Sequence, residues 1–294
     1  MQGDHRLIRL GSVCLGVPDP HATARFLATS LNFATSSRPD GGWDVATGGE
    51  YAFPVPQRNL TLLPGDGMEL REVTFDTPQG YAFDELERRA REQGLKTVPL
   101  APGEDGGTGL ALLDDDGLRL ACRPPGLPLS HQLPPSPLRP RRLGHVNLKV
   151  PDPRRTMELI GDVLGLRLSE QIGEDFYFLR IGPEHHNLGI RGGSQAPSVH
   201  HVGFEVAGWE SYRVICDHLA GLGHRVEYGP GRHGPGRNLF VYLRDPSSGL
   251  RLELYSDMAH IHDEEAYEPV RWELRDRPRT VNQWGPAPPD SFLT

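Results

Sequence analysis

Two stretches of the chain nearly repeat each other: GSVCLGVPDP at residues 11–20 and GHVNLKVPDP at residues 144–153, which lie 133 positions apart. The alternating apolar residues of each copy predict a strand. The aspartate near the end of each copy, Asp19 or Asp152, can cap a helix, and the proline that follows it suits a first helical turn. Each half of the chain therefore opens with a strand that leads directly into a helix.

A weaker repeat lies inside each half. The segment REVTFD at 71–76 aligns with HHVGFE at 200–205. A predicted helix follows each of these segments, and further strands end in the segments 117–122 and 249–254. A unit of one strand, one helix and about three strands thus occurs four times. This pattern predicts an α+β fold of four βαβββ modules, two in each half.

A proline-rich run separates the two halves. The seven prolines between Arg123 and Arg142 exclude a helix or a central strand and indicate a semi-rigid linker. We therefore expect an N-terminal domain over 1–125, a linker over 126–142 and a C-terminal domain over 143–258. The remaining residues, 259–294, form a polar tail whose tryptophans predict that it packs back over the functional site.

Composition narrows the class of protein. The 294 residues carry a formal net charge of −8 and no long block of lysine and arginine, so we expect no nucleic-acid partner. We also expect no contact with a membrane, because no apolar run approaches the roughly 20 residues of a membrane helix. The N-terminus lacks the apolar core of a secretion signal, and three scattered cysteines are typical of a reducing compartment. These features predict a cytoplasmic globular protein.

Histidines are concentrated in the second half, where eight of the 13 fall between His145 and His233. His145 and His201 occupy matching places in the first strands of their modules, and Glu253 lies between two leucines of a closing strand, so it points opposite to them. Two imidazoles and one carboxylate on the inner face of a sheet form a facial triad, which suits Fe(II), with Mn(II) as the alternative. The corresponding positions of the first half hold Ser12, Glu72 and Ala121. A purely structural need would have recurred there, so we interpret the second set as functional and the N-terminal domain as lacking a metal site.

Three motifs of the second half are similar to those of a known family: GPGRHG at 229–234, VYLRDP at 241–246 and the segment 249–255. With them the chain resembles the type I extradiol ring-cleaving dioxygenases of the vicinal oxygen chelate superfamily, most closely the homoprotocatechuate and catechol 2,3-dioxygenase branch. The resemblance implies two domains, each an incomplete barrel of mixed strands with outer helices. It also implies that the triad holds the metal.

The same resemblance implies roles for residues around the metal. His186, which stands 15 residues before His201, corresponds to the family's acid–base histidine. His233 and Tyr242, nine residues apart, correspond to a second histidine and to the catalytic tyrosine. Asn147 matches an asparagine of the homoprotocatechuate branch.

Two further residues are implied to bind a substituent of the substrate. The homoprotocatechuate branch binds the substrate carboxylate with arginines. Tyr228 takes one such place in this chain, and Arg279 in the tail is the arginine that remains, so a carboxylated substrate is not specified. The other histidines singled out in the second half are interpreted as structural or surface residues: His185, His200, His218 and His224.

The function that the resemblance implies is that of an extradiol, meta-cleaving dioxygenase, an oxidoreductase that opens a catechol-type ring with O2 at a non-haem Fe(II) centre. Two alternatives use the same scaffold: a non-oxidative metal-dependent isomerase or hydrolase, and a metal-free protein that binds small molecules. Members of the family are commonly oligomeric, which predicts a homo-oligomer.

Overall fold

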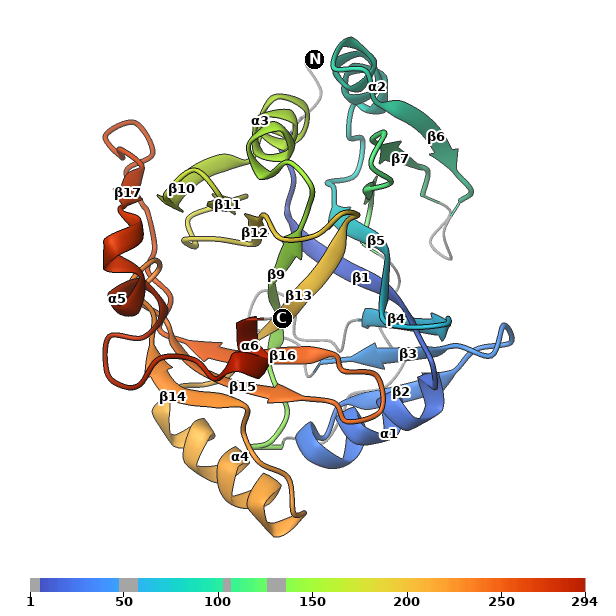
Figure 1. Ribbon diagram of the computed structural model, residues 1–294. Coiled ribbons are helices and arrows are strands. Elements are labelled where there is room, and N and C mark those ends of the chain that lie inside the picture. The colour runs from blue at the N-terminus through green and yellow to red at the C-terminus, as the bar shows by residue number, and fades with distance from the viewer. Residues whose placement is uncertain (1–5, 48–57, 103–106, 126–135, 294) are drawn as a thin grey trace.

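The backbone forms two mixed sheets, one from each half of the chain, with helices on the outside (Figure 1). This computed structural model describes residues 6–47, 58–102, 107–125 and 136–293.

The first sheet has the strand order β2-β3-β4-β1-β5-β8-β7-β6. Its strands are β1 (Arg9–Val17), β2 (Ala34–Ser37), β3 (Trp43–Ala46), β4 (Arg58–Pro64), β5 (Glu69–Asp76), β6 (Lys96–Leu100), β7 (Gly109–Leu113) and β8 (Arg119–Arg123). The helices of this half are α1 (Pro20–Leu31) and α2 (Phe83–Glu92).

The second sheet has the order β14-β15-β16-β13-β9-β12-β11-β10-β17. Its strands are β9 (Arg142–Lys149), β10 (Arg167–Ile172), β11 (Phe176–Arg180), β12 (Leu188–Arg191), β13 (Ser198–Glu205), β14 (Tyr228–Arg232), β15 (Leu239–Arg244), β16 (Arg251–Ser256) and β17 (Val270–Trp272). The helices of this half are α3 (Pro153–Leu164), α4 (Trp209–Gly221) and, in the tail, the 3-10 turn Leu274–Asp276, α5 (Arg277–Val281) and α6 (Asp290–Leu293).

The four modules predicted from the repeats are confirmed. In each module the first strand leads through a helix to three more strands, and the last of these lies parallel beside the first: β4 on β1, β8 on β5, β12 on β9 and β16 on β13. Two modules join through their antiparallel first strands, β1 with β5 and β9 with β13. Within the described residues neither sheet closes on itself, so each is an incomplete barrel of mixed strands.

The aspartate–proline pairs begin helices as predicted. Asp19 Oδ1 accepts a hydrogen bond from the backbone N–H of Ala22 at 2.9 Å, and Asp152 Oδ1 accepts one from Arg155 at 3.0 Å. Each bond satisfies a backbone donor that the first turn of a helix leaves unpaired. Helix α3 ends at Leu164 and is capped by Gly165, whose φ of 74° favours a residue without Cβ.

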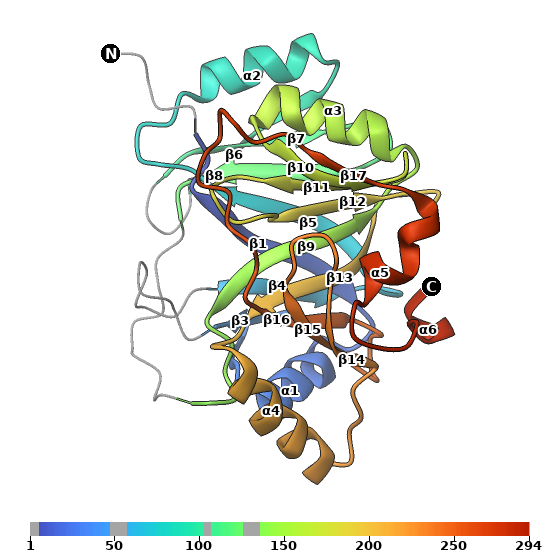
Figure 2. The ribbon, with the colours of Figure 1, turned by 90° about the vertical axis from the view of Figure 1, so that its left-hand side faces the viewer.

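The two halves pack against each other along their length. Helix α2 lies beside α3 over one end of the molecule, and α1 lies beside α4 over the other (Figure 2). Phe33 and Phe204 meet edge to face at 5.0 Å, and Thr23 Oγ1 donates to Asp245 Oδ2 at 2.8 Å. Buried apolar residues of both halves form one continuous core. The first half therefore covers apolar surface that the second half alone would expose to water.

The tail returns to the second sheet. Strand β17 pairs parallel with β10 and adds a ninth strand that the repeats did not predict. Helices α5 and α6 follow along the same side of the molecule (Figure 2). Of the linker expected over 126–142, residues 126–135 lie outside the described residues, and β9 begins at Arg142.

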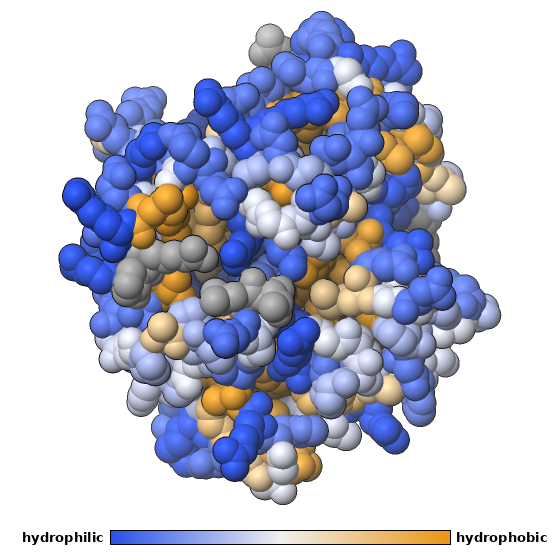
Figure 3. Space-filling view, viewed as in Figure 1, coloured by the Kyte–Doolittle hydropathy of each residue, from blue (hydrophilic) through white to orange (hydrophobic). Residues whose placement is uncertain are grey.

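None of the helices in the described residues is long and apolar enough to span a bilayer. On the face seen in Figure 1 the surface is mostly hydrophilic, and its apolar side chains show as separate patches (Figure 3).

Candidate active site

Three buried side chains from adjacent strands meet on one face of the second sheet. His145 lies on β9, His201 on β13 and Glu253 on β16, and these strands are neighbours in the order β16-β13-β9. The Nε2 atoms of the two histidines lie 3.2 Å apart, and Glu253 Oε2 lies 3.0 Å and 3.1 Å from them. The structure thus brings together the three residues that the sequence predicts as a triad.

Gly203 at the centre of β13 makes this convergence possible. It pairs with His145 on one side and with Glu253 on the other, so the three residues face the same way. His201 shares that face because it stands two residues away on the same strand. A Cβ at Gly203 would lie 2.2 Å from Cε1 of His145, where such contacts need about 3.5 Å. The missing side chain leaves the space that the imidazole occupies.

The spacing of the triad fits an octahedral metal ion. Ligands on adjacent corners of an octahedron stand about 3.0 Å apart when the bonds to the metal are about 2.1 Å long. The observed separations of 3.0, 3.1 and 3.2 Å match one face of such an octahedron. Two histidines and a carboxylate with three open positions are the ligand set of non-haem iron.

The protonation states of the triad suit metal binding. Burial lowers the pKa of His201 to about 4, although Glu253 acts in the other direction. Burial alone would raise the pKa of Glu253, but the neighbouring histidines, His145 first, hold it well below its usual range. At neutral pH His201 is therefore neutral and Glu253 is ionised, as a metal ligand must be. His145 Nδ1 is buried and has no hydrogen-bond partner among the described residues.

Hydrogen bonds orient the carboxylate of Glu253. Asn238 Nδ2 donates to its Oε1 at 2.8 Å, and the Tyr242 hydroxyl donates to its Oε2 at 2.6 Å. The same hydroxyl lies 2.9 Å from Nε2 of His233, whose Nδ1 donates to the carbonyl of Val281 at 2.7 Å. A neutral His233 therefore has an unprotonated Nε2, and the single proton of Tyr242 can serve either this nitrogen or Glu253. Burial, and then the charge of Glu253, raise the pKa of Tyr242 well above 10, so it stays a phenol.

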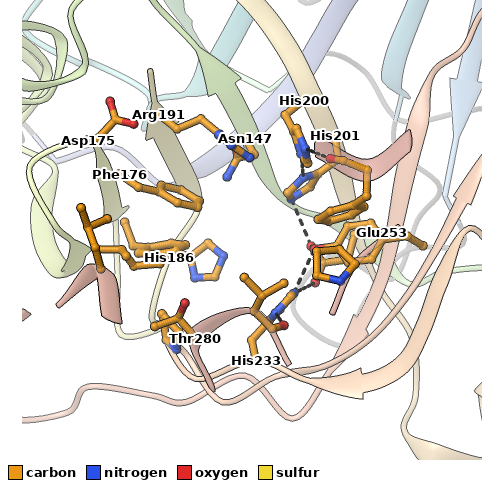
Figure 4. Close-up of a pocket in the computed structure, with 18 residues that line it drawn as sticks. Asn147, Asp175, Phe176, His186, Arg191, His200, His201, His233, Glu253 and Thr280 are labelled. Carbon is orange, nitrogen blue, oxygen red and sulfur yellow. Dashed lines mark hydrogen bonds and ion pairs between the residues drawn. The ribbon is translucent and has the colours of Figure 1, made fainter. Parts of the chain in front are cut away.

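His186 and Asn147 line the same pocket, and His186 lies across it from Glu253 (Figure 4). The ring of His186 stands 4.7 Å from the ring of His145. Burial, and then His145, hold the pKa of His186 well below 6.5, so it is neutral at pH 7. Asn147 is buried, and its Oδ1 has no partner among the described residues. The pocket therefore contains all four residues that the resemblance places around the metal.

The rest of the pocket is largely apolar and includes part of the tail. The apolar lining residues are Ile172, Phe176, Phe178, Leu274, Pro235, Val281, Pro288 and Phe292. Polar side chains join them at Asp175, Arg191 and Thr280 (Figure 4). A flat aromatic molecule would find mostly apolar contacts in this space.

His200 occupies a position that the sequence does not reveal. The pairing of β13 with β9 skips this residue, so the strand has a β-bulge there. Two successive histidines therefore both line the pocket, which regular alternation would prevent. His200 Nδ1 lies 2.7 Å from Nδ1 of His201, and its Nε2 lies 3.0 Å from the carbonyl of Phe292. Because a carbonyl only accepts, His200 Nε2 donates and its Nδ1 accepts from His201, which leaves His201 Nε2 unprotonated.

The two residues expected to bind a substrate substituent do not line the pocket. Tyr228 is buried, and its hydroxyl donates to the carbonyl of Pro286 at 2.9 Å. Arg279 is exposed. Arg191 at the end of β12 does line the pocket, with its guanidinium 5.6 Å from the ring centre of Phe176. No motif in the sequence singles out Arg191, because an arginine at the end of a strand is ordinarily a surface residue.

The first half contains no comparable cluster among its described residues. Glu72 forms an ion pair with Arg119 at 2.7 Å, and Ala121 carries no polar group. The carboxylate of Glu72, at the position equivalent to His201, is thus paired with a side chain of the protein itself.

Residues 142–254 match the family described as the Glyoxalase/Bleomycin resistance protein/Dioxygenase superfamily. This stretch begins with β9, reaches into β16 and contains the whole triad. The match therefore covers the two modules of the second half, and the arrangement of all four modules is that of the vicinal oxygen chelate fold.

The relatives include a metapyrocatechase and a dioxygenase by name. The chain is 33% identical to metapyrocatechase 2 of Cupriavidus necator over 156 residues, which are 52% of this chain and 47% of that protein. It thus spans about half the length of that relative. It is 25% identical over 256 residues to the manganese-dependent 2,3-dihydroxybiphenyl 1,2-dioxygenase of Geobacillus genomosp. 3, covering 77% of this chain and 79% of that one. The crystal structure of homoprotocatechuate 2,3-dioxygenase from Arthrobacter globiformis aligns with a TM-score of 0.86 at 22% identity, over 99% of this chain and 92% of that one, and this likeness shows the fold.

Proposed function

We propose that the protein is an extradiol dioxygenase, an oxidoreductase that opens a catechol-type ring beside its two hydroxyl groups with O2. The observation that carries the proposal is the triad, whose ligand atoms form one face of an octahedron beside a pocket. Two vicinal oxygens and one O2 need three adjacent positions on a metal, and such a face leaves three. The names of the two relatives support the same activity.

His145, His201 and Glu253 would hold Fe(II), with Mn(II) as the alternative. When bound, such an ion supplies the route by which electrons pass between a catecholate and O2, whose triplet ground state reacts slowly with closed-shell molecules. The manganese dependence in the name of one relative supports the alternative metal.

Tyr242 and His233 would prepare the substrate. A catechol must lose protons before it is readily oxidised, and the unprotonated Nε2 of His233 can take one. The Tyr242 hydroxyl, 2.6 Å from Glu253 and 2.9 Å from His233, would hydrogen-bond a substrate oxygen and order its deprotonation. His233 stands on the Glu253 side of the pocket (Figure 4), and the hydrogen bond to Glu253 places the Tyr242 hydroxyl there as well.

His186 would act as the acid–base group on the other side. It is neutral at pH 7, so it can first accept a proton and then return it to an oxygen as the O–O bond breaks. Asn147, which lines the same pocket, would position the substrate through its amide.

The remaining assignments follow from these roles. Residues 143–258 would form the catalytic domain, 1–125 a supporting domain without a metal, and 259–294 a cover for the pocket. Arg191 and Asp175, which also line the pocket, would contact a substituent on the ring. We further propose that the protein forms homo-oligomers, as members of the family commonly do.

Anaerobic purification with metal analysis, followed by catechols and air, tests the proposal. We expect about one iron or manganese per chain and, with catechol, the yellow absorbance of 2-hydroxymuconic semialdehyde. His145→Ala is the control, and it should have neither metal nor product. Bound metal without O2 uptake on any catechol would indicate a non-oxidative relative, and no metal after loading with Fe(II) would indicate a binding protein.

A further inference from the structure

His185 is a buried histidine next to His186 that the mechanism above does not use. It is 2% exposed, and its backbone N–H donates to the carbonyl of Ala259 at 2.8 Å. The two rings stand perpendicular, and their Nδ1 atoms lie 2.9 Å apart. Two imidazole nitrogens at this distance share one proton, so one of them donates and the other accepts.

A carboxylate lies on the far side of the His185 ring. Glu170 Oε1, on β10, stands 3.3 Å from His185 Nε2. Trp272 of β17 donates its indole N–H to the other oxygen of Glu170 at 2.5 Å, which holds the carboxylate in place. His185 Nε2 is buried and makes no hydrogen bond among the described residues, so the carboxylate of Glu170 at 3.3 Å is the acceptor within ion-pair range of this nitrogen. Strand β17 thereby orients the carboxylate of Glu170, which contacts His185, and His185 in turn contacts His186 at the pocket.

These contacts determine which nitrogen of each ring carries the proton. An ionised carboxylate can only accept, so the contact with Glu170 is favourable when His185 Nε2 is protonated. A neutral His185 then has an unprotonated Nδ1, which accepts from Nδ1–H of His186. His186 is left with an unprotonated Nε2, the nitrogen that remains for the pocket.

We propose that Glu170 and His185 are positioning residues that hold His186 in the tautomer with an unprotonated Nε2 facing the pocket. The importance of this tautomer for turnover rests on the proposed function, whereas the hydrogen-bond arrangement does not. Where a carboxylate holds a catalytic histidine in one tautomer, its replacement by the amide can lower turnover by up to about 10⁴-fold. The two residues act through His186 and touch neither the metal ligands nor the substrate.

Glu170→Gln is the most informative variant because it reverses the donor and acceptor roles in the contacts that link Glu170, His185 and His186. The amide oxygen can still accept from Trp272, while the amide nitrogen must donate to His185 Nε2. His185 Nδ1 would then carry the proton and donate to His186, whose Nε2 becomes protonated. The matched control is Glu174→Gln, since the exposed Glu174 carboxylate binds Arg271 of the same tail strand and faces neither histidine.

The first readout is the tautomer itself, measured by 15N NMR of ring-labelled histidine in the Zn(II)-loaded protein. The His186 signals are assigned by their absence from His186→Phe. We expect His186 to be protonated at Nδ1 in the wild type and in Glu174→Gln, and at Nε2 in Glu170→Gln. A wild-type His186 protonated at Nε2, or a His185 protonated at both nitrogens, would overturn the proposal.

The second readout is turnover of the metal-loaded enzyme. We expect Glu170→Gln to lower kcat at least about 10-fold with KM and metal content unchanged. His185→Leu should lower kcat similarly, whereas His185→Asn should restore most of it, because its Oδ1 can accept where Nδ1 did. A merely structural role would not produce this rescue, and equal losses in both His185 variants would contradict the proposal.

Together, the two readouts distinguish a failure of the proposed dioxygenase function from a failure of the proposed positioning role. A wild type with the expected tautomer but no activity on any catechol would refute the dioxygenase function and leave the arrangement standing. An active wild type whose tautomer and kcat do not respond to Glu170→Gln would refute the positioning role alone.

Discussion

Adding one methyl group at Gly203 should destroy the metal site. In Gly203→Ala the new Cβ would lie 2.2 Å from Cε1, 2.4 Å from Nε2 and 2.5 Å from Nδ1 of His145. To restore a contact of about 3.5 Å, the imidazole must retreat by more than about 1 Å. Metal–ligand distances tolerate only about 0.2 Å, so Nε2 of His145 would leave the triangle. We expect the affinity for Fe(II) or Mn(II) to fall at least about 100-fold.

The assay is titration of the metal-free protein with Mn(II), with free Mn(II) measured by electron paramagnetic resonance. Gly221→Ala is the matched control, because a Cβ at this position in α4 would meet nothing within 4 Å, and it should bind as the wild type does. Thermal unfolding accompanies the titration, since overpacking alone costs about 1–3 kcal/mol of stability. A folded Gly203→Ala that binds Mn(II) with wild-type affinity would refute the reasoning about the triad's geometry.

Three further changes test separate parts of the molecule. Glu253→Gln removes the charged ligand and should abolish bound metal and ring cleavage, as measured by metal analysis after gel filtration; a variant that keeps its metal would rule out the triad. His186→Phe should keep the metal but lower turnover by about 10²–10⁴-fold in an O2-uptake assay, and wild-type kcat would end its acid–base assignment. Arg251→Leu leaves the buried carboxylate of Glu227 without the partner that now lies 2.7 Å away. It should lower the free energy of unfolding by about 3–5 kcal/mol in urea, and an unchanged midpoint would show that this ion pair contributes little.

The modules and the triad could be predicted because their signals are local or repeated. A helix cap involves residues three positions apart, as at Asp152 and Arg155, and a strand is recognised from the alternation of neighbours. The triad was found by comparing two copies of one plan, since His145 and Glu253 have no equivalents in the first half. Strand order within a module then follows from the same plan.

The surroundings of the triad could not be predicted in the same way. His200 faces the pocket because β13 carries a bulge, and the direction of a side chain in a strand reverses when one residue is inserted. The resemblance places Tyr228 and Arg279 by analogy with positions in other chains, whereas Arg191 reaches the pocket from the end of β12. The sequence contains no local signal for either outcome.

By itself, the sequence determined the four modules and the three residues of the triad. Only the tertiary structure decided which neighbours surround the triad. The contact of Glu170 with His185, and that of Glu170 with Trp272 about 100 residues later, join segments that no short-range pattern relates. Such contacts depend on strand register and on where the tail docks, and both are determined by packing of the whole chain.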